Sequence, residues 1–148
     1  MADTETPTTE APQSTEPQVK QTFIWGTGRR KSAVARVRIA PGNGTIQING
    51  RTLNDYFTAE RDRKSIFGPL EVTNTGGKMD IFVNATGGGP SGQTGAIIMG
   101  LSRALAKYDQ TLEAPLRGAN FMTRDSRMKE RKKYGLHGAR RGTQFSKR

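Results

Sequence analysis

Apolar and polar residues alternate along two stretches of the chain. Ala33–Ala40 reads AVARVRIA, and Lys78–Ala85 reads KMDIFVNA. A period of two predicts half-buried strands that each carry one polar or charged face. A shorter strand is predicted at Phe23–Trp25, where the glycines of Gly26–Gly28 are expected to end it.

The segment between the two alternating stretches predicts a turn, a strand and two helices. Residues 41–44 read PGNG, a strong turn signal, and Thr45–Ile48 (TIQI) is expected to follow as the hairpin partner of the strand before the turn. Short helices are predicted at Arg51–Phe57 and Arg61–Phe67. Pro69 is expected to close the second helix, because proline cannot continue the hydrogen-bonded ladder.

A longer helix is predicted from about Ser91 to Tyr108. Its apolar side holds Ile97, Leu101, Ala104 and Leu105. Its other side carries, at near-helical spacing, Ala96, Gly100, Arg103 and Lys107. The small residues leave room for the backbone of a partner to approach the helix, and the two cations that follow can pair with its charge. Those two cations are therefore candidate phosphate ligands. The alternative is a solvated helix face.

The last part of the chain shows no helical packing pattern after Leu116. Asp125 is a candidate N-cap for a short helix reaching Lys133, because its carboxylate can accept the first unpaired amides. No packed element is predicted beyond Gly135. The residues from there to Arg148, if extended, span on the order of 45–50 Å at about 3.4 Å each.

Charge divides the 148 residues into three parts. Residues 1–20 carry four acidic residues and one lysine and are rich in Thr, Pro and Glu, which predicts a disordered acidic leader. That leader is either a solvated extension or an anionic decoy that keeps the wrong RNA away. Residues 21–116 are mildly basic and are predicted to form the globular α/β domain, and residues 117–148 carry eleven cations against two acids. This last part is predicted to be a basic extension.

Composition excludes several classes of function. The chain has no cysteine, so it has no disulfide, thiolate metal site or cysteine nucleophile. No apolar run approaches the roughly 18 residues of a membrane span, and the first residues lack a signal-peptide pattern. His137 is the single histidine and has no visible base-orienting partner, and the acids lack metal-ligand spacing. We therefore expect a cytoplasmic protein that is not an enzyme and has no metal, cofactor or small-molecule substrate.

A glycine-rich segment at residues 87–94 reads GGGPSGQT and resembles two nucleotide-binding loops. It fits G-x-G-x-x-G, and it fits the phosphate-loop pattern except that Gln93 stands where lysine must contact the phosphates. A nucleotide-binding enzyme is therefore the minor alternative. A glycine turn that opens a helix also attracts RNA phosphate, and a purely structural turn is the other possibility. The candidate phosphate ligands here are Gly88, Gly89, Ser91, Gly92 and Gln93.

Basic residues concentrate in clusters that aromatic residues and glycines interrupt. The first cluster is Arg29–Lys31, and the longest is RMKERKK at residues 127–133. Aromatics beside arginines can stack on unpaired bases while cations neutralise phosphates. Binding to structured RNA is therefore the leading hypothesis, and a free protein that coats nucleic acid without sequence preference is a further alternative. The basic and polar candidates are Arg29, Arg30, Lys31, Arg36, Arg103, Lys107, Arg124, Arg127, Lys129, Arg131, Lys132, Lys133, Arg140, Arg141 and Gln144.

An ordered series of motifs resembles one family. They read GTGRRKSAVARV from residue 26, PGNG from 41, GGGPSGQTGAI from 87, TRD from 123, ERKK from 130 and QFSKR from 144. Together they resemble bacterial small-subunit ribosomal protein nine from about Thr22 to the end of the chain. Ile98 and Met99 stand where that family is commonly basic, and residues 136–143 are less basic than is usual there.

The resemblance implies a fold and a set of partners. The fold would be α/β (α+β), a compact two-layer arrangement with helices on one face of a sheet, like the second domain of ribosomal protein five, followed by the long basic tail. The partners would be the 3′ major domain of 16S ribosomal RNA in the head of the 30S subunit, neighbouring ribosomal proteins and tRNA in the peptidyl site. The tail end would approach the anticodon stem-loop of that tRNA through Ser146, Lys147 and Arg148.

Overall fold

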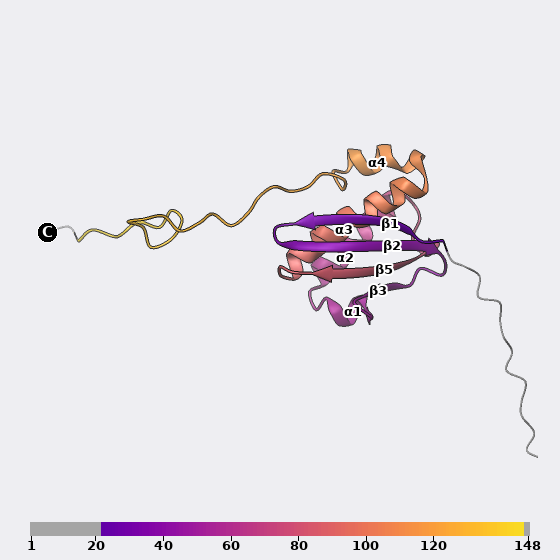
Figure 1. The fold of residues 1–148 in the computed structure, drawn as a ribbon, viewed down its shortest axis with the longest axis horizontal. Helices are drawn as coiled ribbons and strands as arrows, with labels where there is room; N and C mark the ends of the chain where they lie inside the picture. The colour runs from indigo at the N-terminus through magenta and orange to yellow at the C-terminus, as the bar shows by residue number, and fades with distance from the viewer. Residues whose placement is uncertain (1–21, 147–148) are drawn as a thin grey trace, which may run out of the picture.

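Two strands that alternate in sequence form the centre of a mixed sheet in the computed structural model, which describes residues 22–146 (Figure 1). The sheet has five strands in the order β1-β2-β5-β3-β4. The strands are β1 (Ile24–Arg30), β2 (Ala33–Pro41), β3 (Ile46–Ile48), β4 (Arg51–Thr52) and β5 (Met79–Thr86). The helices are α1 (Leu53–Tyr56), α2 (Glu60–Val72), α3 (Pro90–Tyr108), the 3-10 turn η1 (Gln110–Leu112) and α4 (Glu113–Gly118). The domain is therefore of the α+β class.

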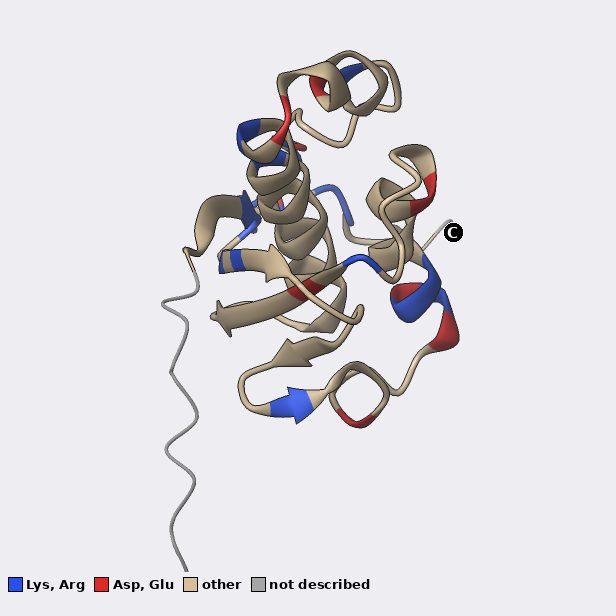
Figure 2. Ribbon diagram, turned by 90° about the vertical axis from the view of Figure 1, so that its right-hand side faces the viewer, with Lys and Arg blue, Asp and Glu red and all other residues tan. Residues whose placement is uncertain are grey.

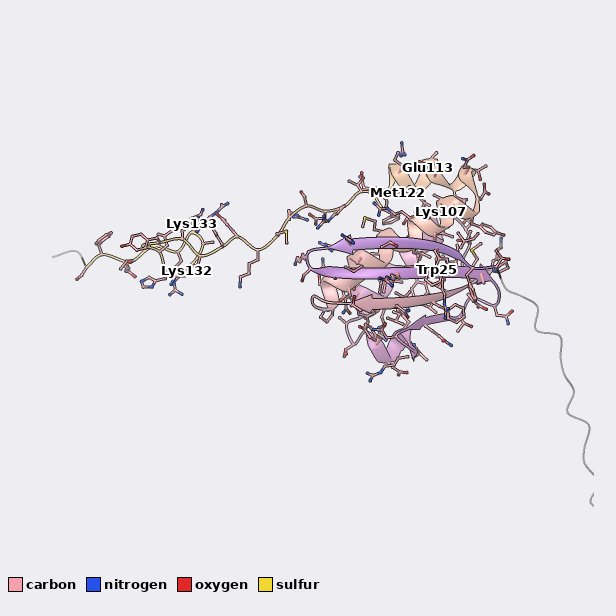
Figure 3. All side chains as sticks on the ribbon, viewed as in Figure 1. Trp25, Lys107, Glu113, Met122, Lys132 and Lys133 are labelled. Carbon is pink, nitrogen blue, oxygen red and sulfur yellow. The ribbon has the colours of Figure 1, made fainter. Side chains whose placement is uncertain are left out.

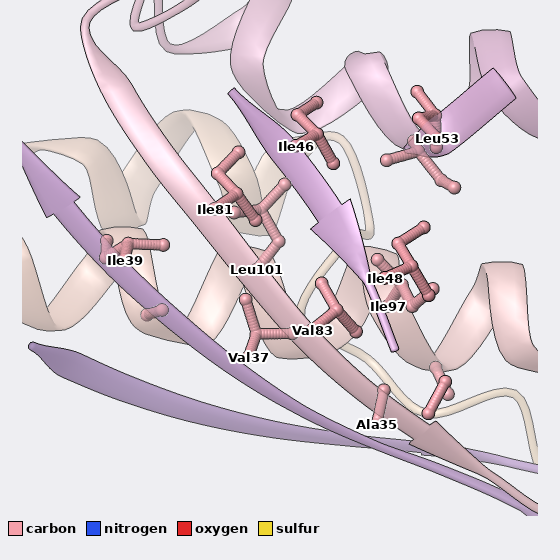
Figure 4. Close-up of a cluster of buried hydrophobic side chains, with 14 of the residues drawn as sticks. Ala35, Val37, Ile39, Ile46, Ile48, Leu53, Ile81, Val83, Ile97 and Leu101 are labelled. Carbon is pink, nitrogen blue, oxygen red and sulfur yellow. The ribbon is translucent and has the colours of Figure 1, made fainter. Parts of the chain in front are cut away.

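The core lies between the sheet and helices α2 and α3. Alternate residues of β2 and β5 point inward and are buried, as the sequence predicts, and the residues between them are more exposed except for the buried Ala40. Figure 4 shows how these side chains meet those of α3, with Val37 and Val83 close to Leu101. Because burying one such aliphatic side chain stabilises a fold by about 1.5–3 kcal/mol, the alternation fixes which face of each strand turns inward.

The predicted hairpin between β2 and residues 45–48 is wrong. β5 pairs antiparallel with β2 along its whole length, and β3 pairs in parallel with the far side of β5. The PGNG segment carries the chain past the start of β5, where Asp80 Oδ1 accepts the amides of Asn43 (3.0 Å) and Thr45 (2.9 Å). A three-residue strand cannot compete with β5 for the edge of β2, because β5 offers a longer ladder and more buried side chains.

Strand β1 does not end at Gly26–Gly28, and the prediction that those glycines are strand breakers is also wrong. β1 runs through them, and α3 packs directly on its backbone. A Cβ at Gly26 would lie 2.1 Å from the carbonyl oxygen of Gly100, and one at Gly28 would lie 2.0 Å from that of Ala96. Glycine is required because strand and helix backbones approach closer than any side chain permits.

The helices between β3 and β5 differ from the predicted ones. Residues 51–52 form β4, and Thr52 caps the short helix α1 by accepting the amide of Asp55 (3.4 Å). α2 continues through Pro69 to Val72, whereas the sequence predicts that Pro69 ends it. Pro69 and Leu70 are buried, so their packing offsets the cost of a proline inside a helix, which is about 3 kcal/mol.

Packing also continues beyond α3, into a part of the chain where no packing signal is visible in the sequence. Leu116 of α4 is completely buried, and Phe121 and Met122 pack against the core. The Phe121 ring lies over Gly68 of α2, where an added Cβ would stand 3.1 Å from the ring. After Met122 the chain leaves the domain as the extended tail (Figure 1).

Candidate nucleic-acid interface

Three segments meet at the end of the domain from which the tail departs. They are the β1–β2 turn, the glycine loop between β5 and α3, and the first residues of the tail (Figure 1). The glycine loop packs on the turn, since a Cβ at Gly87 would lie 2.7 Å from the carbonyl oxygen of Ser32. We call this end, with its three segments, the turn end.

The β1–β2 turn carries the first predicted basic cluster. Arg29 and Lys31 are exposed, and Lys31 adopts a positive φ of 53° at the tip. Arg30 is half-buried, because its stem lies across α3, where a Cβ on Gly95 would stand 2.3 Å from its Cδ. Arg29 and Lys31 form no ion pair within residues 22–146, so the turn presents two cations and fixes the third.

The glycine loop is held by Gln93 rather than left open. Gln93 donates from Nε2 to the Gly87 carbonyl (3.1 Å), and its Oε1 accepts the hydroxyl of Tyr56 (2.8 Å). Asn49 in turn donates to the Tyr56 oxygen (3.3 Å). Gln93 thus holds the glycine loop in place at the position where a phosphate loop has its lysine. Tyr56 and Asn49 support Gln93, and the sequence pattern does not reveal either of them.

The loop geometry narrows the predicted phosphate ligands. The amides of Gly92 and Gln93 both donate to the Gly89 carbonyl (2.9 and 3.0 Å), and Gly92 is buried. Pro90, at the first helical position, has no amide proton. Gly88, Gly89 and Ser91 are exposed and remain the candidates at the start of α3.

Asp125 joins the tail to the β1–β2 turn. The prediction that Asp125 caps a helix is wrong, because residues 126–146 form no helix. Its carboxylate instead accepts the amide of Arg127 (3.0 Å) and its guanidinium (2.9 Å), and it also pairs with Arg30 (3.1 Å). Hydrogen bonds from Arg127, together with both positive charges, hold the pKa of Asp125 well below its usual range.

Replacing Asp125 with alanine should release the root of the tail. Hydrogen exchange at the Arg127 amide, measured by NMR, should accelerate roughly tenfold because its charged acceptor is lost. Since the folded-state pKa is lowered, the stabilisation is present above the ordinary value of about 4. The protection in the unmodified protein should therefore persist from pH 7 to pH 4 and fade only at lower pH.

Asp109 supplies the matched control for this experiment, because it accepts the Thr111 amide (2.9 Å) in the same local geometry. Asp109→Ala should expose the Thr111 amide and leave that of Arg127 protected. Equal exchange at Arg127 in the Asp125→Ala variant and the unmodified protein would contradict the anchoring role.

The cations of α3 lie away from the turn end. Arg103 donates to the Thr27 carbonyl (2.8 Å) and Lys107 to the Trp25 carbonyl (3.0 Å). Ala96 and Gly100 on the same side are buried against β1. The small residues therefore make room for the backbone of β1, and the two cations donate hydrogen bonds to the same backbone. Figure 3 places Lys107 and Trp25 at the end of the domain opposite the tail.

The described part of the tail carries a compact loop in an otherwise extended chain. Glu130 pairs with Lys133 and with Arg140 (2.9 Å), and the His137 amide donates to the Arg141 carbonyl (2.8 Å). The sequence predicts no such element beyond Gly135. The exposed tail candidates that form no ion pair within residues 22–146 are Arg124, Lys129, Arg131, Lys132, Arg141 and Gln144. Of the predicted tRNA ligands, Ser146 is exposed, and Lys147 and Arg148 lie outside the described residues.

Charge on α2 is balanced, in contrast to the tail. Its first turns mix Arg61, Arg63 and Lys64 with Glu60 and Asp62, so blue and red segments adjoin at the start of the helix in Figure 2. Lys64 pairs with Glu60 at 2.7 Å. A surface with both signs interspersed attracts a polyanion weakly, so α2 is a weaker RNA candidate than the turn end and the tail.

Neither a metal site nor a membrane-spanning helix is found in the part of the chain that the structure describes. No three His, Asp or Glu side chains between residues 22 and 146 lie close enough to hold a metal ion. No helix in the same range is both long and apolar enough to cross a membrane.

Comparison with known proteins gives a family. The model for the family described as Ribosomal protein S9/S16 matches residues 28–148. The small ribosomal subunit protein uS9 of Rhodopirellula baltica is 54% identical over 123 residues, which cover 83% of this chain and 90% of that protein. The matched range includes all three segments of the turn end and the basic tail that continues from it. The chain therefore belongs to the ribosomal protein S9/S16 family.

Proposed function

We propose that this protein is a structural constituent of the small ribosomal subunit and binds ribosomal RNA through the turn end and the tail. The observation that carries the proposal is the convergence of exposed turn cations, an exposed glycine turn and a tail root at one end of the domain. The tail then adds exposed cations on a chain that leaves the core. Family membership confirms the prediction of a ribosomal protein that is not an enzyme.

The finer placement also belongs to this proposal. The RNA is the 3′ major domain of 16S ribosomal RNA in the 30S head, and the fold is that of the second domain of ribosomal protein five. The protein would act in the cytoplasm, among neighbouring small-subunit proteins. One sheet with α2 and α3 on one face supports the fold assignment. The strong similarity to a uS9 protein supports the placement.

The division of the chain remains part of the proposal as well. Residues 1–20 would be an acidic leader, residues 21–116 the globular RNA-binding domain, and residues 117–148 the basic extension that reaches peptidyl-site tRNA. The exposed Ser146 and the two cations that follow it would contact the anticodon stem-loop. The departure of the tail from the turn end supports this, because a chain leaving the RNA-bound end can pass through RNA to a distant ligand (Figure 1).

Deleting Lys147 and Arg148 should weaken peptidyl-site tRNA binding by roughly 1–3 kcal/mol, because charge-assisted hydrogen bonds to phosphate are lost. Small subunits reconstituted with the shortened protein would be tested for tRNA binding by filter retention. Sedimentation at high salt should find the shortened protein in the small-subunit fraction. Unchanged tRNA affinity would refute the contact at the tail end, and absence of the full-length protein from that fraction would refute the ribosomal role.

A further inference from the structure

The open face of the sheet presents three cross-strand rows of side chains. The helices cover the inner face, so alternate residues of β1, β2 and β5 point away from them. In register, the rows are Trp25, Arg38 and Phe82, then Thr27, Arg36 and Asn84, and then Arg29, Val34 and Thr86. The third row reaches the turn end through Arg29, so the open face adjoins the proposed RNA-binding region.

The first row holds an arginine among aromatic rings. The Arg38 guanidinium lies 5.0 Å from the ring centroids of Phe23 and Phe82 and 6.0 Å from that of Trp25. Phe23 and Phe82 meet edge to face at 6.0 Å. This packing orients the guanidinium and the rings before any ligand arrives, so little side-chain entropy remains to be lost on binding.

Trp25 offers a flat surface on a fixed backbone. Lys107 donates to the Trp25 carbonyl oxygen (3.0 Å), and 49% of the Trp25 surface is exposed. A large aromatic side chain half exposed on a rigid strand suits stacking with a planar ligand.

Positive charge predominates on this face. Arg29, Arg36 and Arg38 have no carboxylate within ion-pair distance among residues 22–146. Asp80, the acid on the neighbouring part of β5, accepts the amides of Asn43 and Thr45 and forms no ion pair with the arginines of this face. Three unpaired arginines on one sheet face favour an anionic partner.

A hollow lies over the second and third rows. Its volume is about 680 Å³, and its lining includes Arg29, Arg36 and Asn84. Amide and guanidinium groups at one open hollow match the hydrogen-bonding groups of a nucleotide, which combines a base edge with a phosphate.

We propose that the open face of the sheet binds a single-stranded segment of RNA, with a base stacked on Trp25 and the following phosphates paired with Arg38 and Arg36. The path continues through the hollow to Arg29 and so reaches the turn end. The interior of a duplex cannot make this contact, because its base faces are stacked inside the helix. The inference rests on the proposed RNA-binding function and adds a second surface to it.

Trp25 is the single tryptophan of the chain, so its fluorescence reports this contact directly. The full-length protein would be titrated with a seven-nucleotide oligoadenylate and, separately, with a blunt RNA duplex of the same length. The single strand should quench Trp25 saturably, and the duplex should not. Filter binding of ribosomal RNA, measured in parallel, separates this inference from the proposed function.

Charge-removing variants sharpen the test. Arg36→Gln with Arg38→Gln should move the quenching midpoint to a roughly 10- to 50-fold higher RNA concentration, because two phosphate contacts are lost. Arg61→Gln with Lys64→Gln removes the same charge from α2 and should leave the midpoint unchanged. Circular dichroism would verify that both double variants fold.

Three outcomes would overturn the inference. RNA retained on filters without quenching of Trp25 means that the face does not bind RNA, while the proposed function stands. Quenching by an oligoglutamate peptide but not by RNA assigns the face to an acidic protein. A change in Trp25 fluorescence with protein concentration alone assigns it to a second copy of this chain. Failure of filter binding itself would instead count against the proposed function.

Discussion

Gly28→Ala should destabilise the domain by about 3 kcal/mol or more, a large share of the 5–15 kcal/mol by which domains are typically stable. The new Cβ would lie 2.0 Å from the Ala96 carbonyl oxygen and 2.5 Å from the Gly100 amide nitrogen. Both atoms belong to the backbone of α3 and cannot rotate away, so the helix must move off the sheet. Urea unfolding followed by circular dichroism and Trp25 fluorescence would measure the loss.

Gly76 provides the control, because it lies in an exposed turn with no atom within 4 Å of an added Cβ. Gly76→Ala should change stability by no more than about 0.5 kcal/mol. An unchanged urea midpoint for Gly28→Ala would mean that α3 does not pack on β1 as closely as described.

Neutralising Arg131 and Lys132 together should produce the largest change in RNA affinity among the tail variants. Both are exposed and free of ion pairs within the described tail, whereas Lys133 and Arg140 are engaged with Glu130. Each lost phosphate contact removes about 0.7–0.9 of a power of the salt dependence, so affinity at 0.1 M salt should fall about 30-fold. Filter binding of a 16S ribosomal RNA 3′-domain transcript at several salt concentrations would measure both the affinity and its slope.

Arg61→Ala with Lys64→Ala is the matched control, since it removes the same number of charges from α2, where acids surround them. Its salt slope should equal that of the unmodified protein. An equal loss of affinity in both double variants would show that RNA senses only the net charge of the chain and not the tail.

Local pattern suffices for the elements that form the centre of the fold. β2, β5 and α3 each bury one face, so their periodicity is visible in the sequence, and their positions agree with the predictions to within a few residues. The pairing of β3 is not local, because it depends on β5, more than thirty residues later in the chain. The twin role of glycine causes the error at β1, since a glycine that ends a strand and one that admits a helix look the same in sequence.

The site divides in the same way. The turn cations and the glycine loop are recognisable because their residue types are unusual and adjacent in sequence. The partners that fix them are distant. Tyr56 bonds to Gln93 across 37 residues, and Asp125 bonds to Arg30 across 95. Asp125 could be read as a helix cap because the local rule is the same for a cap and for an isolated turn.

The bonds from Arg103 and Lys107 to β1 also affect the protein before it meets its RNA. β1 is an outer strand of the sheet, and an outer strand with free carbonyls is a template for pairing with another chain. The two cations occupy the Thr27 and Trp25 carbonyls, so a second molecule would have to displace both bonds before extending the sheet. A newly synthesised copy is thus protected against edge-to-edge aggregation. The two side chains that protect it are cations, which the sequence alone suggests as RNA ligands.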